Sequence, residues 1–134
     1  CEQLGVTDPI YFGQSKFDYL IHLPREEDVQ ALAPNFSALA GIATRGFIVT
    51  AEANAADLDF VSRFFAPATG VNEDPVTGSA HCCLGPYWAR HLNKPALHAA
   101  QRSQRGGSLT VEVVADRVLL TGRAILVGRG ELLL

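Results

Sequence analysis

One segment of the sequence, residues 66–92, joins a loop of polar and turn-forming residues to a long apolar stretch. Between residues 80 and 92 the apolar side chains leave no wide polar stripe, which is typical of a helix that is enclosed on most sides. Thr77, Gly78 and Ser79 come directly before it, and such small residues favour the N-terminus of a helix. The pattern predicts a central helix around which the rest of the chain is organised.

Most of the other expected elements are strands. Alternating or β-branched apolar residues predict strands at residues 17–23, 45–53, 59–66, 97–104, 108–114, 117–121 and 124–127. Gly106 and Gly107 predict a turn, and Gly122 predicts a bulge between the last two strands. Short helices are expected at residues 25–32 and 35–39, covering one face of the sheet, and a linker or edge segment at residues 1–15. The expected fold class is α+β, a curved mixed or antiparallel sheet wrapped around one central apolar helix.

Composition narrows the partners that the chain can have. Its 134 residues suit one domain, and the 11 basic and 14 acidic residues are spread without long runs. This balance offers neither a nucleic-acid surface nor a basic membrane face, and no apolar run reaches the roughly 18 residues of a membrane helix. We expect a soluble, cytoplasmic protein with a small-molecule ligand and no nucleic-acid or membrane partner. The sequence contains no methionine, which suggests a fragment or a processed product.

Asp74 is the first candidate for chemistry. It precedes Pro75, which favours an extended backbone, and it lies close to the expected helix N-terminus. A carboxylate in this position could act as a general acid or base on a bound substrate. Aspartate is also common in turns and caps for purely structural reasons, so both interpretations stay open.

The backbone N–H groups of residues 78–81 form a second candidate site. Unpaired N–H groups in the first turn of a helix can bind a carboxylate or a phosphate, although an ordinary solvated cap is an equally good interpretation. No lysine follows Gly78 at the position that a P-loop requires. A polar strand end at Gln101, Ser103 and Arg105 could also bind an anion, but a solvated turn is commoner in such places.

His81, Cys82 and Cys83 are of types that bind metals, but consecutive helical residues point about 100° apart and cannot converge on one ion. Cysteines in an apolar helix are more often packing residues. Three cysteines, two of them adjacent, do not resemble a secreted disulfide framework. We therefore expect buried cysteines, no metal and no cofactor.

The segment SRFFAPATGVNEDPVTGSAHCCLGPYW, with QRSQRGG and DRVLLTGRAILVGRGEL after it, resembles the phenazine-biosynthesis PhzF-like isomerase family. In that family, which shares the diaminopimelate-epimerase-like fold, two similar halves each wrap a sheet around a central helix. The substrate lies in the cleft between the halves. The resemblance implies that residues 1–134 form a single domain similar to the second, C-terminal half. The partners would then be the missing N-terminal half and a small carboxylate-bearing substrate.

The resemblance also implies roles for particular residues. Asp74 and Ser79 would be catalytic, Asp74 as the acidic partner in the cleft and Ser79 as a hydroxyl that contacts the substrate. Thr77, Gly78, Ser79 and Ala80 would bind the substrate. The principal proton-shuttling glutamate of the family and a nearby histidine belong to the first half. The implied activity is a cofactor-independent proton shift, of which dihydro-hydroxyanthranilate isomerisation is the named family reaction.

Two other functions remain as alternatives. The chain could be a non-catalytic small-molecule-binding or assembly module of the same fold, and a homodimer is one assembly to consider. Amino-acid epimerisation by a pair of thiols is disfavoured, because Cys82 and Cys83 lie on the helix while the loop offers Asp74.

Overall fold

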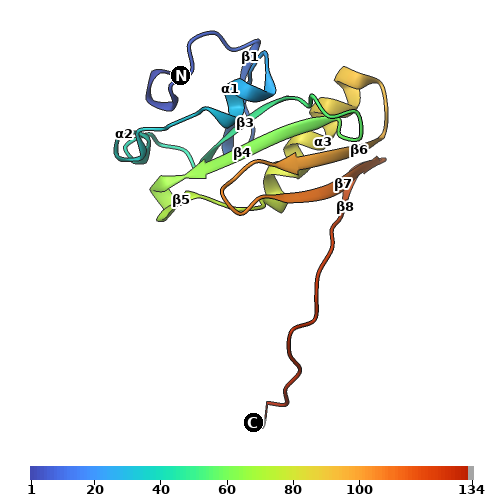
Figure 1. Cartoon of the computed structure of the whole chain (residues 1–134). Helices are drawn as coiled ribbons and strands as arrows, with labels where there is room; N and C mark the ends of the chain where they lie inside the picture. The colour runs from blue at the N-terminus through green and yellow to red at the C-terminus, as the bar shows by residue number, and fades with distance from the viewer. Residues whose placement is uncertain (133–134) are drawn as a thin grey trace.

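The structure is a computed structural model that describes residues 1–132. One curved, eight-stranded sheet forms its centre (Figure 1), and the predicted α+β class is confirmed. Its strands follow the order β1-β2-β3-β4-β6-β7-β8, with β5 paired to β4. The β2–β3 and β4–β6 pairs are parallel and the others are antiparallel. The strands are β1 (Tyr11–Gln14), β2 (Asp18–His22), β3 (Gly46–Glu52), β4 (Phe60–Ala66), β5 (Val71–Glu73), β6 (Ala96–Gln101), β7 (Gly107–Val114) and β8 (Arg117–Thr121).

The helices lie in the crossovers that parallel strand pairs require. Helices α1 (Glu26–Gln30) and α2 (Phe36–Ala40) connect β2 to β3, as predicted, and pack in one hydrophobic cluster. Helix α3 (Gly78–Leu92) belongs to the connection from β4 to β6 and packs in a second cluster. Strand β4 separates the two, since Phe60 and Phe64 belong to the α3 cluster while Val61 and Phe65 belong to the other. Short 3-10 turns occur at Glu2–Leu4 and Pro67–Thr69.

Helix α3 is held to the sheet by Trp88, which is fully buried. Its ring stacks on Phe60 with centroids 5.5 Å apart, and its Nε1 donates a hydrogen bond to Thr50 Oγ1 at 3.0 Å. Gly85 lets the helix approach β7 closely, because a Cβ at this position would lie only 2.8 Å from Val111 Cγ1. The predicted central helix is therefore confirmed as the main packing element on its face of the sheet.

The expectation that this helix is enclosed on most sides is wrong for the described residues. Its buried positions lie on the face toward the sheet, whereas other positions are open to solvent. The sequence pattern misleads because small residues such as Cys and Ala expose little apolar area, so they tolerate either environment. The buried residues of α3 are Ala80, His81, Leu84, Gly85 and Trp88, and the exposed ones include Ser79, Cys82, Arg90 and His91.

The C-terminal segment also differs from expectation. No strand forms at residues 124–127 in the described part of the chain, and the predicted bulge at Gly122 is wrong as well, since β8 ends at Thr121. Residues 122–132 extend away from the sheet (Figure 1), leaving Ile125 87% and Val127 95% exposed. A strand needs a neighbour to pair with, and none of the described strands lies beside this segment. Residues 1–15 contain the edge strand β1, in agreement with an edge segment.

None of the helices within residues 1–132 combines the length and the hydropathy needed to cross a lipid bilayer.

His22, at the end of β2, is a buried histidine. Its Nδ1 lies 2.8 Å from the Tyr87 hydroxyl, and its ring contacts Trp88 and His91 edge-on. Burial, and secondarily the nearby His91, lower the pKa of His22 from 6.5 to about 4. The folded protein therefore keeps this imidazole neutral at a pH where an unfolded chain would protonate it.

This shift predicts a loss of stability in acid. Between pH 6.5 and pH 4 the unfolded chain binds a proton at His22 that the folded chain does not, so the free energy of unfolding falls as the pH falls. We expect His22→Phe to show a smaller decrease of the denaturant midpoint between pH 7 and pH 4.5 than the unsubstituted protein. Equal decreases in both proteins would contradict the assignment.

Candidate functional site

The candidate site is the loop at residues 74–77, which connects β5 to α3. The backbone N–H of Asp74 donates to the carbonyl of Phe64 at 3.0 Å, so the loop begins anchored to β4. The Oδ2 of Asp74 accepts a hydrogen bond from the hydroxyl of Thr77 at 2.5 Å. Its Oδ1 accepts none from residues 1–132. The carboxylate is thus held by one oxygen, and its other oxygen has no hydrogen-bond donor in this part of the chain.

Helix α3 begins at Gly78, and Thr77 occupies its N-cap. The Thr77 hydroxyl does not cap the helix, because it donates to Asp74 instead, and no other described side chain caps the first turn. Such a helix end presents N–H donors and a partial positive charge beside the carboxylate. The geometry places a carboxylate and the N-terminus of a helix side by side.

The five predicted site residues differ in what they could offer a ligand. Asp74 and Thr77 are in direct contact, and Gly78 and Ser79 follow them with exposed positions in the first turn. The side chain of Ala80 is buried in the core, so only its backbone could meet a substrate. The five residues therefore share one helix end, but only Asp74 and Ser79 offer side-chain groups that a ligand could reach.

Neither interpretation of the polar end of β6, an anion site or a solvated turn, holds for two of its residues. Gln101 is only 1% exposed, and its amide is bonded to the loop. The Ser103 hydroxyl donates to the carbonyl of Pro75 at 2.8 Å. Both side chains form hydrogen bonds that hold the loop. These bonds stabilise them, because a buried polar group is stable only when it is paired. Arg105 remains exposed in the turn that follows.

The sequence did contain a signal for the buried position of Gln101. Leu97 and Ala99 of β6 face the α3 cluster, and alternation places residue 101 on the same face. A glutamine on a buried strand face needs polar partners nearby, which the preceding loop supplies.

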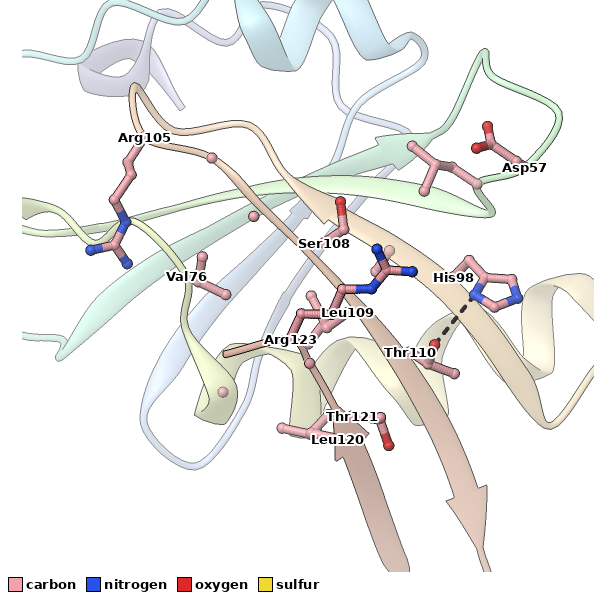
Figure 2. Close-up of a pocket in the computed structure, with 16 residues that line it drawn as sticks. Asp57, Val76, His98, Arg105, Ser108, Leu109, Thr110, Leu120, Thr121 and Arg123 are labelled. Carbon is pink, nitrogen blue, oxygen red and sulfur yellow. Dashed lines mark hydrogen bonds between the residues drawn. The ribbon is translucent and has the colours of Figure 1, made fainter. Parts of the chain in front are cut away.

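A cavity of about 980 Å³ borders the helix end (Figure 2), but Asp74 and Ser79 do not line it. Gly107 belongs to its wall and has no room for a side chain, since a Cβ there would lie 2.3 Å from Val76 Cγ2. The cavity therefore adjoins the loop through Val76 and is separate from the carboxylate. Its lining includes Val76, Gly78, Arg105, Gly107, Leu120 and Arg123.

The predicted burial of the cysteines is wrong for Cys82, which is exposed, and Cys83 is half-buried. Burial raises the pKa of the Cys83 thiol, so this residue favours its neutral form. His81 is buried, and its Nδ1 contacts the carbonyl of Thr77 at 2.8 Å. No group of three or more His, Cys, Asp or Glu side chains within residues 1–132 is arranged to hold a metal ion.

We expect Cys82→Ala to change the free energy of unfolding by less than about 0.5 kcal/mol, because an exposed side chain leaves no cavity when shortened. Cys83→Ala should have a larger effect on stability, since its thiol is half-buried. Urea unfolding of both variants tests the stabilities, and any isomerase activity should stay within a few-fold of the unsubstituted protein. Loss of activity in a folded variant would revive the thiol mechanism.

Comparison with known proteins places the chain among relatives of about twice its length. Residues 9–130 match the family model PhzC-PhzF, described as phenazine biosynthesis-like protein. Uncharacterized isomerases of Halalkalibacterium halodurans and Pseudomonas aeruginosa are each 55% identical to it. The alignments cover 98% and 96% of this chain but 49% and 45% of those proteins.

A crystal structure of a PhzF-family phenazine biosynthesis protein from Enterococcus faecalis aligns with a TM-score of 0.88 and 44% identity, covering 99% of this chain and 50% of that one. The chain thus spans about half the length of the relatives it matches. The resemblance predicted from the residues around the loop and α3 is confirmed. Sequence, fold and family model agree, and the chain belongs to the PhzC-PhzF family of phenazine biosynthesis-like proteins.

Proposed function

We propose that this chain forms one wall of a cofactor-independent isomerase that moves a proton within a small carboxylate-bearing substrate. The observation that carries the proposal is the position of the Asp74 carboxylate, which accepts the Thr77 hydroxyl directly before the N-terminus of α3. The relatives named as isomerases, which are about twice as long, support the same reaction class.

In the proposed reaction the N-terminus of α3 binds the substrate and Asp74 transfers the proton. N–H donors of Gly78 and Ser79 would hold the substrate carboxylate, with the helix dipole favouring the negative charge. The free Oδ1 of Asp74 would take up a proton at one substrate position or deliver it at another. An acid–base group of the other half would complete the transfer, since a proton shift needs a donor and an acceptor within reach of one enclosed substrate.

Exposed apolar side chains support a second half as the partner. The edge strands β1 and β8 expose Tyr11, Phe12 and Leu119, and the segment after β8 exposes Ile125 and Val127. Single exposed apolar residues are ordinary, but several at the edges of one sheet are typical of a surface that another unit covers. The proposed cleft would lie between that unit and the loop.

Incorporation of solvent deuterium tests the proposal. The protein with both halves would be incubated in D₂O with dihydro-hydroxyanthranilate and a set of other small cyclic or amino-acid-like carboxylates, and the products analysed by mass spectrometry and NMR. Isomerisation by proton transfer predicts deuterium at a carbon of at least one product, since an acid–base group exchanges its proton with water. Binding without incorporation for every compound would contradict the proposal and favour the non-catalytic binding module.

A further inference from the structure

We infer that Gln101 is a positioning residue. Its buried amide holds Asp74 and Thr77, the residue directly before α3, in the arrangement that proton transfer needs. The inference rests on the proposed function. Gln101 would not touch the substrate itself, because its side chain is buried beneath the loop.

The amide of Gln101 bonds to both ends of the loop. Its Nε2 donates to the backbone carbonyl of Asp74 at 2.6 Å and to the Thr77 hydroxyl at 3.1 Å. Its Oε1 accepts the backbone N–H of Thr77 at 2.8 Å. The partners fix the orientation of the amide, since a carbonyl can only accept and a backbone N–H can only donate. One side chain therefore spans the loop that carries the carboxylate.

These bonds also determine how the Thr77 hydroxyl is used. Because Gln101 Nε2 donates to this hydroxyl, the proton of Thr77 Oγ1 is directed to Asp74 Oδ2. These hydrogen bonds run from Gln101 through Thr77 to the Asp74 carboxylate. Among the described residues, none donates a hydrogen bond to the Oδ1 of Asp74. Hydrogen bonds in such a series strengthen one another, and removing the first member weakens the others.

The turn after β6 holds the same loop at two further points. Ser103 donates to the carbonyl of Pro75 and accepts the N–H of Gly106 at 3.0 Å. Gly107 contacts Val76 at a distance that only a glycine permits. The loop should therefore stay packed when Gln101 is replaced. The replacement should change the orientation of the Asp74 carboxylate more than it changes the fold.

Two replacements of similar volume separate the bonds of Gln101 from its shape. Gln101→Met keeps the volume and removes all three bonds. Gln101→Glu keeps an acceptor for the Thr77 N–H, but its carboxylate removes both donated bonds and adds a negative charge beneath the loop. In the protein with both halves, we expect kcat to fall about 10- to 100-fold in each variant, with a smaller change in KM. A displacement of about 1 Å in a reacting group is sufficient for such a loss.

Ser62→Ala is the matched control. Ser62 lies on β4 opposite Gln101 in the strand register, it is equally buried, and its hydroxyl has no partner among the described residues. Its loss should leave kcat within about 2-fold. Retention of kcat within 2-fold in both Gln101 variants would overturn the inference, as would an equal loss in Ser62→Ala.

Amide hydrogen exchange supplies a readout that does not depend on turnover. Gln101→Met should lose protection at the amides of Asp74 and Thr77, the two hydrogen-bonded N–H groups of the loop, and keep it in β3 and β4. A general loss of stability would lower protection in all of these elements. If the unsubstituted protein turns over none of the carboxylates, the proposed function fails, and the exchange pattern alone then decides whether Gln101 holds the loop. Unchanged or uniformly lowered protection would overturn that role.

Discussion

Replacing Asp74 by Asn in the protein with both halves is expected to abolish isomerisation while leaving the fold nearly unchanged. An Asn carbonyl can still accept the Thr77 hydroxyl, and the backbone N–H of residue 74 still reaches Phe64. The amide cannot act as a general acid or base near neutral pH, so the acid–base contribution of about 10²- to 10⁴-fold is lost. Deuterium incorporation and kcat measure the effect.

Asp116→Asn is a suitable control for this variant, since Asp116 is an exposed aspartate in the turn between β7 and β8. It should retain full activity. Thermal unfolding should give closely similar midpoints for the two variants and the unsubstituted protein. Near-normal turnover by Asp74→Asn would remove this carboxylate from the mechanism.

The largest effect on stability is expected for Trp88→Ala. The substitution removes a fully buried ring that stacks on Phe60 and the hydrogen bond from its Nε1 to Thr50. Thr50 remains paired, because its hydroxyl donates to the carbonyl of Val61 at 2.6 Å, so the loss is mainly one of packing. Truncation of a buried Trp costs about 3–5 kcal/mol. That is a large part of the stability of an ordinary domain.

Urea unfolding measures this cost, and Tyr11→Ala serves as the control. Tyr11 is also aromatic, but it lies exposed on the edge strand β1 and should contribute much less. A decrease below about 1 kcal/mol for Trp88→Ala would mean that α3 is not the element around which this face of the sheet packs.

The sequence predicted those elements that local patterns determine. The apolar pattern of residues 59–66 predicted strand β4, and the small residues Thr77 and Gly78 marked the start of α3. These features depend on residues within one or two turns of each other, where side-chain period and backbone preference act directly. The short strand β5 was missed, because three residues are too few to show a period.

The errors concern contacts between distant parts of the chain. Residues 124–127 have the composition of a strand, but pairing requires a neighbour that the described residues do not supply. The exposure of Cys82 depends on which side of α3 the sheet covers, and the apolar pattern does not contain that information. The pairing of Gln101 with the loop joins residues 27 positions apart, so residue spacing alone could suggest only an anion site or a solvated turn.

A mixing experiment can decide whether this chain supplies one wall of a two-half active site. Isolated, the 134-residue chain would leave Asp74 and the helix end in water, where charges are screened and nothing excludes solvent from a carbanion-like intermediate. The exposed apolar residues at the sheet edges should also cause it to self-associate.

The measurement is deuterium incorporation by the 134-residue chain alone and after addition of the other half, using a carboxylate that the two-half protein turns over, with light scattering on both samples. We expect no incorporation and self-association for the chain alone, and incorporation together with a defined complex after mixing. Turnover by a monodisperse monomer of the chain without the other half would contradict this expectation.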